Sequence, residues 1–199
     1  MGFIYTLLLA VLFIISLPLQ AVVAVLVLVT AGRPILFVQQ RVGKNGKPFI
    51  MYKFRTMIQN ADKNQMSYRR MNESSGPVFK IHNDPRFVGI GKFLSHTGLD
   101  ELPQIWNVLI GDMALVGPRP LPISEAKKLV AWMQERQTVL PGIISPAILT
   151  GKYHKNFTAW MKSDVAYIKT KTFWSDVGLL FQFLPFLVGL QIKEISKAR

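Results

Sequence analysis

An uncharged apolar segment at the start of the chain constrains its fold most. The residues from Phe3 to Ala31 are almost all apolar, and the first charged residue is Arg33. About 20 apolar residues suffice to cross the hydrocarbon core of a bilayer, so this segment is long enough to insert into one. A cleaved signal peptide is the weaker interpretation, because no basic residues precede the run and its length exceeds the usual roughly 7–15 apolar residues.

A proline in the middle of this segment leaves two topologies open. Pro18 removes a backbone donor and kinks a helix, and Ser16 or Gln20 can supply a partner for the freed carbonyls. A kinked spanning helix and a re-entrant helix, which returns to the side it entered from, both fit these residues. The basic residues after Gly32 place that end on the cytoplasmic side. We therefore divide the chain into a membrane-inserted helix, residues 1–32, and a cytoplasmic domain on the membrane surface, residues 33–199.

The rest of the chain is strongly basic. The 199 residues include 24 Lys and Arg against 11 Asp and Glu, a net charge of +13, although half of them are hydrophobic. A basic body behind an apolar segment is typical of a protein that faces anionic lipids or anionic substrates. The chain has no cysteine, which excludes disulfides and thiolate chemistry. No nucleotide-binding glycine loop is present, and the three histidines (His82, His96 and His154) lack the spacing of a zinc hydrolase.

The body is predicted to be a mainly helical α+β domain that begins with a β-hairpin. Residues 35–40 and 48–54 are β-prone, and Asn45-Gly46 between them is a tight-turn signature. Residues 59–76 are polar and read as a helix fragment that runs into a loop. Residues 113–116 resemble a short strand.

Several helices are expected after the hairpin. One lies within residues 91–111, and another covers 124–137, with Ser124 as its cap and Leu129, Val130 and Met133 on its apolar side. A third covers 158–167, where Asp164 and Tyr167 are candidates for scaffold hydrogen bonds. Residues 177–190 are apolar but interrupted by Pro185. They are too short to span a bilayer and favour a helix that lies at the interface or is buried in the body.

Two adjacent acids stand at the start of an apolar helical pattern. Asp100 and Glu101 fall in or beside a first helical turn, whether the helix is capped by Thr97 or begins near Pro103. Acids are common at helix starts because the helix dipole favours negative charge, so their position alone does not establish a catalytic role. Adjacent helical residues do not share a face. One acid can therefore meet a substrate while the other holds a metal.

Three basic side chains are candidates for binding phosphate. Arg119 lies between Pro118 and Pro120, which fix the backbone, and its guanidinium can donate two parallel hydrogen bonds. Lys53 and Arg55 are two residues apart in the second strand and should point to the same side of it. A solvated, lipid-facing basic edge is the alternative interpretation of that pair.

These stretches resemble the bacterial sugar transferase family. The similarity is carried, in order, by Lys53-Phe54-Arg55-Thr56-Met57, Leu99-Asp100-Glu101-Leu102-Pro103-Gln104, Asn107-Val108-Leu109, Gly111-Asp112-Met113 and Val116-Gly117-Pro118-Arg119-Pro120. It extends from the apolar segment to about Asp176. Members are monotopic phosphoglycosyl transferases, and this chain looks like the small single-domain form. The resemblance implies that Asp100 attacks the β-phosphate of a UDP-sugar, that UMP leaves, and that undecaprenyl phosphate then accepts the phosphosugar.

The same resemblance implies a site, a cofactor and a location. Mg²⁺ is required, membrane lipids surround the protein, and no nucleic acid is involved. The location is the bacterial inner membrane, with the catalytic domain on the cytoplasmic face, and the apolar segment is a re-entrant helix. Asp100 and Glu101 are the candidates for catalysis and for binding Mg²⁺. The candidates for binding substrate phosphate are Arg119, Lys53, Arg55 and Gln104. Ser16 and Pro18 are the candidates for the break in the membrane helix.

Four departures from the family pattern accompany the resemblance. Leu140 stands where arginine is usual, and Ser95 stands where a basic residue is common just before the two acids. Leu17 occupies the position of the re-entrant serine, and no basic pair precedes the apolar segment. A catalytically weak or inactive family member that acts as a membrane scaffold is therefore the alternative function. A protein that binds anionic lipid or nucleic acid is a more distant one. No residue pattern indicates which sugar is used.

Overall fold

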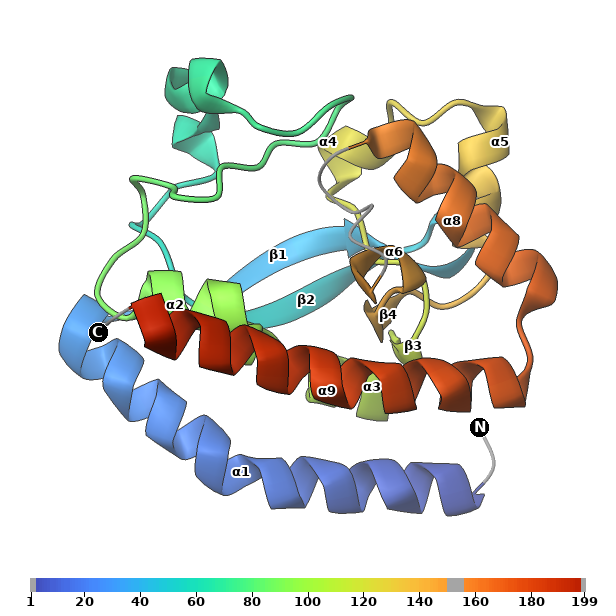
Figure 1. Ribbon diagram of the computed structural model, residues 1–199, viewed down its shortest axis with the longest axis horizontal. Helices are drawn as coiled ribbons and strands as arrows, with labels where there is room; N and C mark the ends of the chain where they lie inside the picture. The colour runs from blue at the N-terminus through green and yellow to red at the C-terminus, as the bar shows by residue number, and fades with distance from the viewer. Residues whose placement is uncertain (1–2, 150–155, 198–199) are drawn as a thin grey trace.

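An antiparallel hairpin forms the centre of the fold in the computed structural model, which describes residues 3–149 and 156–197 (Figure 1). Strand β1 (Leu36–Val42) pairs with β2 (Pro48–Phe54) along its full length. The turn η1 (Lys44–Gly46) places Asn45 at φ 56° and Gly46 at φ 76°. Asparagine and glycine adopt this left-handed conformation most readily. The predicted hairpin is confirmed, and so is the mainly helical α+β class.

The N-terminal apolar segment forms a single helix that contains the proline. Helix α1 (Phe3–Ala31) has 29 residues, and Figure 1 shows it bending partway along its length. The Ser16 hydroxyl donates to the carbonyl of Phe13 at 2.7 Å, and Gln20 Nε2 donates to Ser16 Oγ at 2.8 Å. These two bonds lie close to Pro18, but neither is made to the carbonyl of Ile14, which loses its helical donor at the proline. A side-chain partner for that carbonyl stays a prediction.

Both halves of α1 pack against the body of the protein. Leu9 in the first half is buried in a cluster with Val108. Val23 and Val27 in the second half are buried in another cluster with Leu94. The helix therefore lies along the domain instead of leaving it, and its remaining large apolar side chains are mostly exposed.

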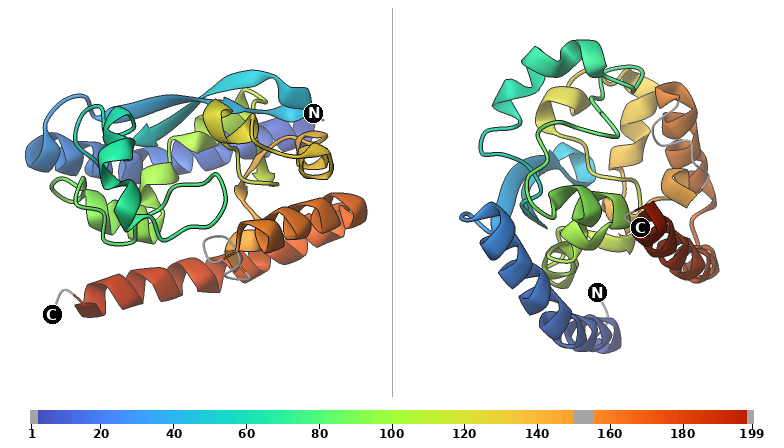
Figure 2. Two further views of the ribbon diagram at one scale, coloured as in Figure 1. Left: turned by 90° about the horizontal axis from the view of Figure 1, so that it is seen from above. Right: turned by 60° about the vertical axis from the view of Figure 1, so that its left-hand side comes forward.

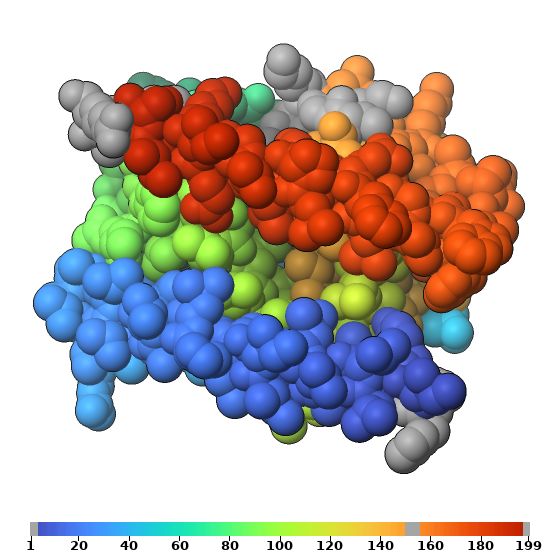
Figure 3. Space-filling view, turned by 60° about the horizontal axis from the view of Figure 1, so that its bottom comes forward, coloured from blue at the N-terminus to red at the C-terminus, as the bar shows by residue number. Residues whose placement is uncertain are grey.

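The last helix lies on the same face as α1. Helix α9 (Phe173–Lys197) has 25 residues with Pro185 inside it, which is longer than the predicted apolar stretch 177–190. By length and composition it could cross a membrane, as could α1, so the expectation that it is too short is wrong. Figure 3 shows α1 and α9 running across one face of the molecule. The exposed large apolar side chains of α9 are Phe173, Trp174, Phe181, Leu184, Val188, Ile192 and Ile195.

The region predicted as the central helix is divided into three short elements. Helix α2 (Gly91–Thr97) ends at Gly98, which has φ 74°. The 3-10 turn η3 (Leu99–Glu101) follows, and α3 (Gln104–Leu109) then begins after Pro103. Of the two helix starts considered, the one near Pro103 is correct. Thr97 ends α2, and its hydroxyl donates to the carbonyl of Phe93 at 2.7 Å.

The expected helix over residues 124–137 is also divided, and this prediction was wrong. The chain forms α4 (Ile123–Ala126), α5 (Ala131–Gln134) and η4 (Glu135–Gln137). Ser124 lies inside α4 and does not cap it. Leu129 is buried in the core, whereas Val130 is extended and exposed. Burial of Leu129 between the two helices takes precedence over the local helical pattern, because core packing outweighs weak propensity.

The remaining elements complete a small second sheet and a helical layer (Figure 2). Strand β3 (Ala114–Val116), which was predicted, pairs in parallel with β4 (Gly142–Ile144), which was not. Helix α6 (Pro146–Leu149) follows, and α8 (Phe157–Thr170) confirms the predicted helix over 158–167. Residues 59–76 contain the 3-10 helix η2 (Lys63–Met71) and a loop, as expected. Residues 150–155, which include His154, lie outside the described part of the chain.

Candidate active site

Gly98 and the turn η3 place the two acids between helices α2 and α3. Gly98 adopts a left-handed conformation that favours glycine, and it reverses the chain after α2. Asp100 and Glu101 then lie in a single 3-10 turn, so their side chains diverge from adjacent positions. Both side chains are largely buried, with exposed fractions of 8% and 15%.

Glu101 is fully engaged by two cations. Its Oε1 atom accepts from Lys53 Nζ at 3.0 Å and from Arg119 Nη2, and its Oε2 atom accepts from Arg119 Nη1 at 3.0 Å. This forked pairing is the geometry in which arginine binds a carboxylate most strongly. Although burial raises the pKa of Glu101, the positive charges of Arg119 and Lys53 outweigh it and lower that pKa below the usual range. Glu101 is therefore a permanent carboxylate.

Asp100 is much less constrained. Its carboxylate makes one ion pair, from Oδ2 to Lys53 Nζ at 3.8 Å. Burial raises the pKa of Asp100, Lys53 lowers it, and the negative charge of Glu101 raises it. The net result is a pKa of about 6. A carboxylate with a raised pKa and few partners is the more reactive of the two, because its lone pairs are not committed to cations.

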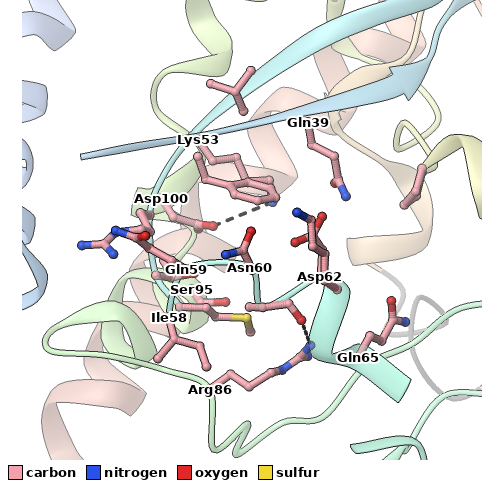
Figure 4. Close-up of a pocket in the computed structure, with 18 of the residues that line it drawn as sticks. Gln39, Lys53, Ile58, Gln59, Asn60, Asp62, Gln65, Arg86, Ser95 and Asp100 are labelled. Atoms are coloured by element: carbon pink, nitrogen blue, oxygen red, sulfur yellow. Dashed lines mark hydrogen bonds and ion pairs between the residues drawn. The ribbon is translucent and has the colours of Figure 1, made fainter. Parts of the chain in front are cut away.

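Asp100 and Lys53 line a cavity of about 590 Å³ beside the hairpin. This volume lies within the roughly 300–1,000 Å³ range of small-molecule sites. Figure 4 shows the two side chains together on one side, with Asn60 and Asp62 across from them and Ser95 nearby. The basic lining residues outnumber the acidic ones. The basic residues are Arg41, Lys53, Arg55, Lys63, Lys80 and Arg86, and the acidic residues are Asp62, Asp100 and Glu125. The cavity therefore favours an anionic ligand.

Arg119 is held from behind by a buried ion pair. Arg136 Nη2 donates to the carbonyl of Arg119 at 2.7 Å. The Arg136 guanidinium also donates to Asp164 Oδ2 at 3.0 and 2.7 Å, and Asp164 is completely buried. The predicted scaffold role of Asp164 is confirmed. Arg136 was missed, since nothing in its sequence neighbourhood distinguishes it from the other cations of a basic chain.

The second predicted scaffold residue, Tyr167, also makes its hydrogen bond. Its hydroxyl donates to Asp176 Oδ1 at 2.5 Å and lies 3.4 Å from the carbonyl oxygen of Val116. Val116 ends strand β3, immediately before the loop that carries Arg119. Tyr167 therefore ties helices α8 and α9 to the strand that positions this loop.

Two of the predicted phosphate ligands, Arg55 and Gln104, do not direct their polar groups at the cavity that Asp100 lines. Arg55 borders the cavity, but its guanidinium donates to the carbonyls of Ala31 and Gly32, the latter at 2.8 Å, and so caps the end of α1. Gln104 is buried with an exposed fraction of 1%, and its Nε2 has no hydrogen-bond partner among the described residues. It does not line the cavity. Phosphate binding by Arg55 or Gln104 stays a prediction.

The acids fit a magnesium ion only in part. Among the described residues, no group of three or more His, Asp or Glu side chains gathers as a metal site. Magnesium is usually held by one or two carboxylates together with substrate phosphates. Asp100 suits this role because its carboxylate borders the cavity with few partners. Glu101 could bind a metal only after exchanging a bond to Arg119 or Lys53.

The fold and the site together define a membrane-associated protein with an acidic pair beside a basic cavity. The two long apolar helices on one face suit attachment to a membrane. The forked cation pairing fixes one acid, while the other faces space for an anion. This arrangement suits chemistry on phosphorylated compounds.

The chain belongs to the bacterial sugar transferase family. Residues 3–189 match the family described as "Bacterial sugar transferase". The "Galactosyl transferase CpsE" of Streptococcus agalactiae is 40% identical over 150 residues, 75% of this chain and 33% of that protein. The "Undecaprenyl-phosphate galactose phosphotransferase" of Salmonella typhimurium is 36% identical over 158 residues, 76% of this chain and 33% of that protein. The chain thus spans about a third of the length of these two relatives.

A Bacillus subtilis relative is closer to this chain in length. It is named "Putative undecaprenyl-phosphate N-acetylgalactosaminyl 1-phosphate transferase" and is 36% identical over 151 residues, 76% of this chain and 74% of that protein. The names of these relatives indicate different sugars. The family is therefore established for this chain, whereas the sugar is not.

Proposed function

We propose that this protein transfers a sugar phosphate from a UDP-sugar to undecaprenyl phosphate, releasing UMP, as the first membrane step of glycan assembly. The observation that carries the proposal is the contrast between the two acids. Glu101 is saturated by Arg119 and Lys53, whereas Asp100 faces a basic cavity with one loose ion pair.

This contrast supports Asp100 as the nucleophile. A carboxylate oxygen of Asp100 attacks the β-phosphorus of the donor, and the bond from that phosphorus to the bridging oxygen breaks as UMP leaves. A phosphate oxygen of undecaprenyl phosphate then attacks the phosphorus on Asp100. The bond between Asp100 and phosphorus breaks, so the carboxylate is regenerated and the polyprenyl diphosphosugar is released. Lys53 contacts both acids and offsets the charge that develops on the phosphate.

Magnesium fits this proposal through Asp100 and the donor phosphates. When bound, Mg²⁺ would supply Lewis-acid neutralisation of the diphosphate. Glu101 contributes instead by holding Arg119 and Lys53 in place. Arg119 is predicted to bind phosphate, and its exchange between Glu101 and a phosphate oxygen keeps the charge of the guanidinium paired throughout.

The packing of α1 supports a re-entrant placement in the membrane. At about 1.5 Å per residue, a straight helix of this length would extend about 43 Å. A spanning helix would carry its first residues to the far side of the bilayer, yet Leu9 and Val27 are both buried against the same domain. We infer that α1 enters and returns on the cytoplasmic face of the bacterial inner membrane, and that α9 lies beside it with Trp174 and Leu184 toward lipid.

The reaction is tested with donor alone and with donor plus acceptor. A panel of UDP-sugars with Mg²⁺ and undecaprenyl phosphate should release UMP for at least one sugar. With that donor alone, intact mass spectrometry should show a phosphosugar adduct that Asp100→Asn abolishes. Asp62→Asn is the matched control, because it removes an exposed carboxylate at the edge of the same cavity. Normal turnover by Asp100→Asn would refute the assignment, and a panel without any UMP release would favour the inactive scaffold.

The topology is tested by cysteine labelling, which has no background because the chain lacks cysteine. Ile4→Cys near the start of α1 and Lys44→Cys in the hairpin turn are compared in intact and lysed spheroplasts with a membrane-impermeant maleimide. Re-entry predicts that neither variant reacts in intact spheroplasts. Reaction of Ile4→Cys alone in intact spheroplasts would show that α1 spans the membrane.

A further inference from the structure

A lysine outside all the motifs considered above borders the cavity that Asp100 faces. Lys80 lies in the loop before α2, and its backbone is fixed at both polar groups. Its N–H donates to Asn72 Oδ1 at 2.8 Å, and its carbonyl accepts from the N–H of Glu73 at 2.8 Å. The side chain is half-buried and lines the cavity together with Lys53 and Asp100. The backbone of Lys80 is therefore fixed, and its side chain extends to the cavity that Asp100 lines.

The Lys80 ammonium group has no carboxylate partner. Among the described residues, no Asp or Glu oxygen lies within 4.0 Å of it, whereas Lys53, Arg86 and Arg119 all have one. Burial lowers the pKa of Lys80, and the neighbouring charges of Arg119 and Lys53 lower it further, against the opposing effect of Asp100 and Glu101. A half-buried cation among cations is unfavourable unless an anion joins it.

The carboxylates near the acidic turn do not balance this charge. Glu101 is taken up by Arg119 and Lys53, and Asp100 is shared with Lys53. Glu125, a partly buried acid of the cavity wall, has partners of its own. It accepts a hydrogen bond from the backbone N–H of Phe79 and interacts electrostatically with Arg41. Of the described lysines that line the cavity, Lys63 is exposed to solvent, whereas Lys80 is partly buried without an ion pair, so a bound anion would neutralise it.

We propose that Lys80 binds a phosphate of the donor diphosphate beside Asp100. This inference rests on the proposed function, because it takes the donor to be a nucleoside diphosphate sugar. Lys80 and Asp100 come from different segments of the chain yet line the same cavity. Neutralisation of a phosphate depends on where a cation lies in space and not on its position in the sequence.

The phosphate could in principle come from the donor or from the lipid acceptor, and the structure favours the donor. The cavity has a volume of about 590 Å³ and is lined by the hairpin strands, by residues between 55 and 65, and by Lys80 and Asp100. That volume lies within the roughly 300–1,000 Å³ range of small-molecule sites, which supports the nucleotide donor as the source of the phosphate.

The test measures UDP binding without turnover. In purified protein that retains Asp100, with Mg²⁺, UDP affinity is measured by calorimetry for the parent and for Lys80→Met. Loss of one charge-assisted contact should weaken UDP binding by about tenfold or more. Lys80→Arg, which keeps the charge, should recover part of the affinity. Lys92→Met on α2 is the matched control, because it removes an exposed lysine outside the cavity and should leave the affinity unchanged.

The possible outcomes separate the two proposals. Parent-like UDP affinity in Lys80→Met would overturn the role of Lys80 while leaving the proposed function intact. The same result combined with a raised KM for undecaprenyl phosphate would show that Lys80 serves the lipid phosphate instead. Absence of UDP binding in the parent protein would overturn the proposed function and this inference together. Unchanged melting temperatures of Lys80→Met and Lys80→Arg exclude misfolding as the cause of weak binding.

Discussion

Two neighbouring substitutions of nearly identical shape are expected to change stability in opposite directions. Asp100→Asn should stabilise the protein at neutral pH, and Glu101→Gln should destabilise it. The reason is that Asp100 is a buried carboxylate with one ion pair at 3.8 Å, whereas Glu101 accepts hydrogen bonds from both Arg119 and Lys53. Composition and position along the chain do not distinguish the two acids, so the prediction tests the tertiary arrangement alone.

The sign for Asp100 follows from its raised pKa. A carboxyl group with a higher pKa in the folded protein holds its proton more tightly there than in the unfolded chain. The free energy of unfolding therefore falls as pH rises from about 4 to about 6. The difference between the ordinary value of 3.8 and the value of about 6 corresponds to at most about 3 kcal/mol at pH 7.5. The same linkage leaves only about 1 kcal/mol at pH 4.5.

The two melting temperatures should accordingly move apart. For a protein of this size 1 kcal/mol is worth about 2–4 °C, so Asp100→Asn should melt up to roughly 6–12 °C higher at pH 7.5. Most of this gain should disappear at pH 4.5. Glu101→Gln leaves Arg119 and Lys53 without their shared carboxylate, and breaking a buried pair in this way costs about 3–5 kcal/mol.

Intrinsic tryptophan fluorescence during heating, in one detergent at both pH values, measures these changes. Asp62→Asn serves as the control, because its exposed carboxylate should leave the melting temperature unchanged. The reasoning is refuted if both variants melt lower than the parent at pH 7.5. It is also refuted if the gain of Asp100→Asn is as large at pH 4.5 as at pH 7.5, since the gain would then have another cause.

Three further predictions concern the reaction and its scaffold. With donor alone, the rate of UMP release should fall about tenfold from pH 7.5 to pH 5.0, because only the ionised form of Asp100 attacks and its pKa is about 6; a rate that is flat over this range contradicts that assignment. Arg119→Ala should lower kcat/KM for the donor by about 100-fold or more, and Arg119→Lys should not restore it, because lysine lacks the forked geometry that holds Glu101. Steady-state UMP release measures both. Asp164→Asn should destabilise the protein by about 3–5 kcal/mol, since it leaves the buried Arg136 unpaired; chemical unfolding that matches the parent would disprove this.

Much of the architecture could be predicted from local patterns in the sequence. The apolar run, the proline inside it, the hairpin with its Asn45-Gly46 turn, and the helix over residues 158–167 each depend on neighbours along the chain. Local predictions failed where packing took precedence. The stretch 124–137 carries a helical pattern, yet it breaks where Leu129 enters the core, and β4 is too short to have a pattern of its own.

The sequence by itself determined which residues are chemically able to act: two adjacent acids, a rigidly held arginine and a basic body behind a membrane segment. Only the tertiary structure decided how these residues divide the work. It pairs Arg119 and Lys53 with Glu101, turns Arg55 toward the end of α1, and brings Lys80 to the cavity that Asp100 faces. The physical reason is that a side chain's reactivity depends on its burial and on the charges around it. Those charges come from segments far apart in the chain, so no local pattern records them.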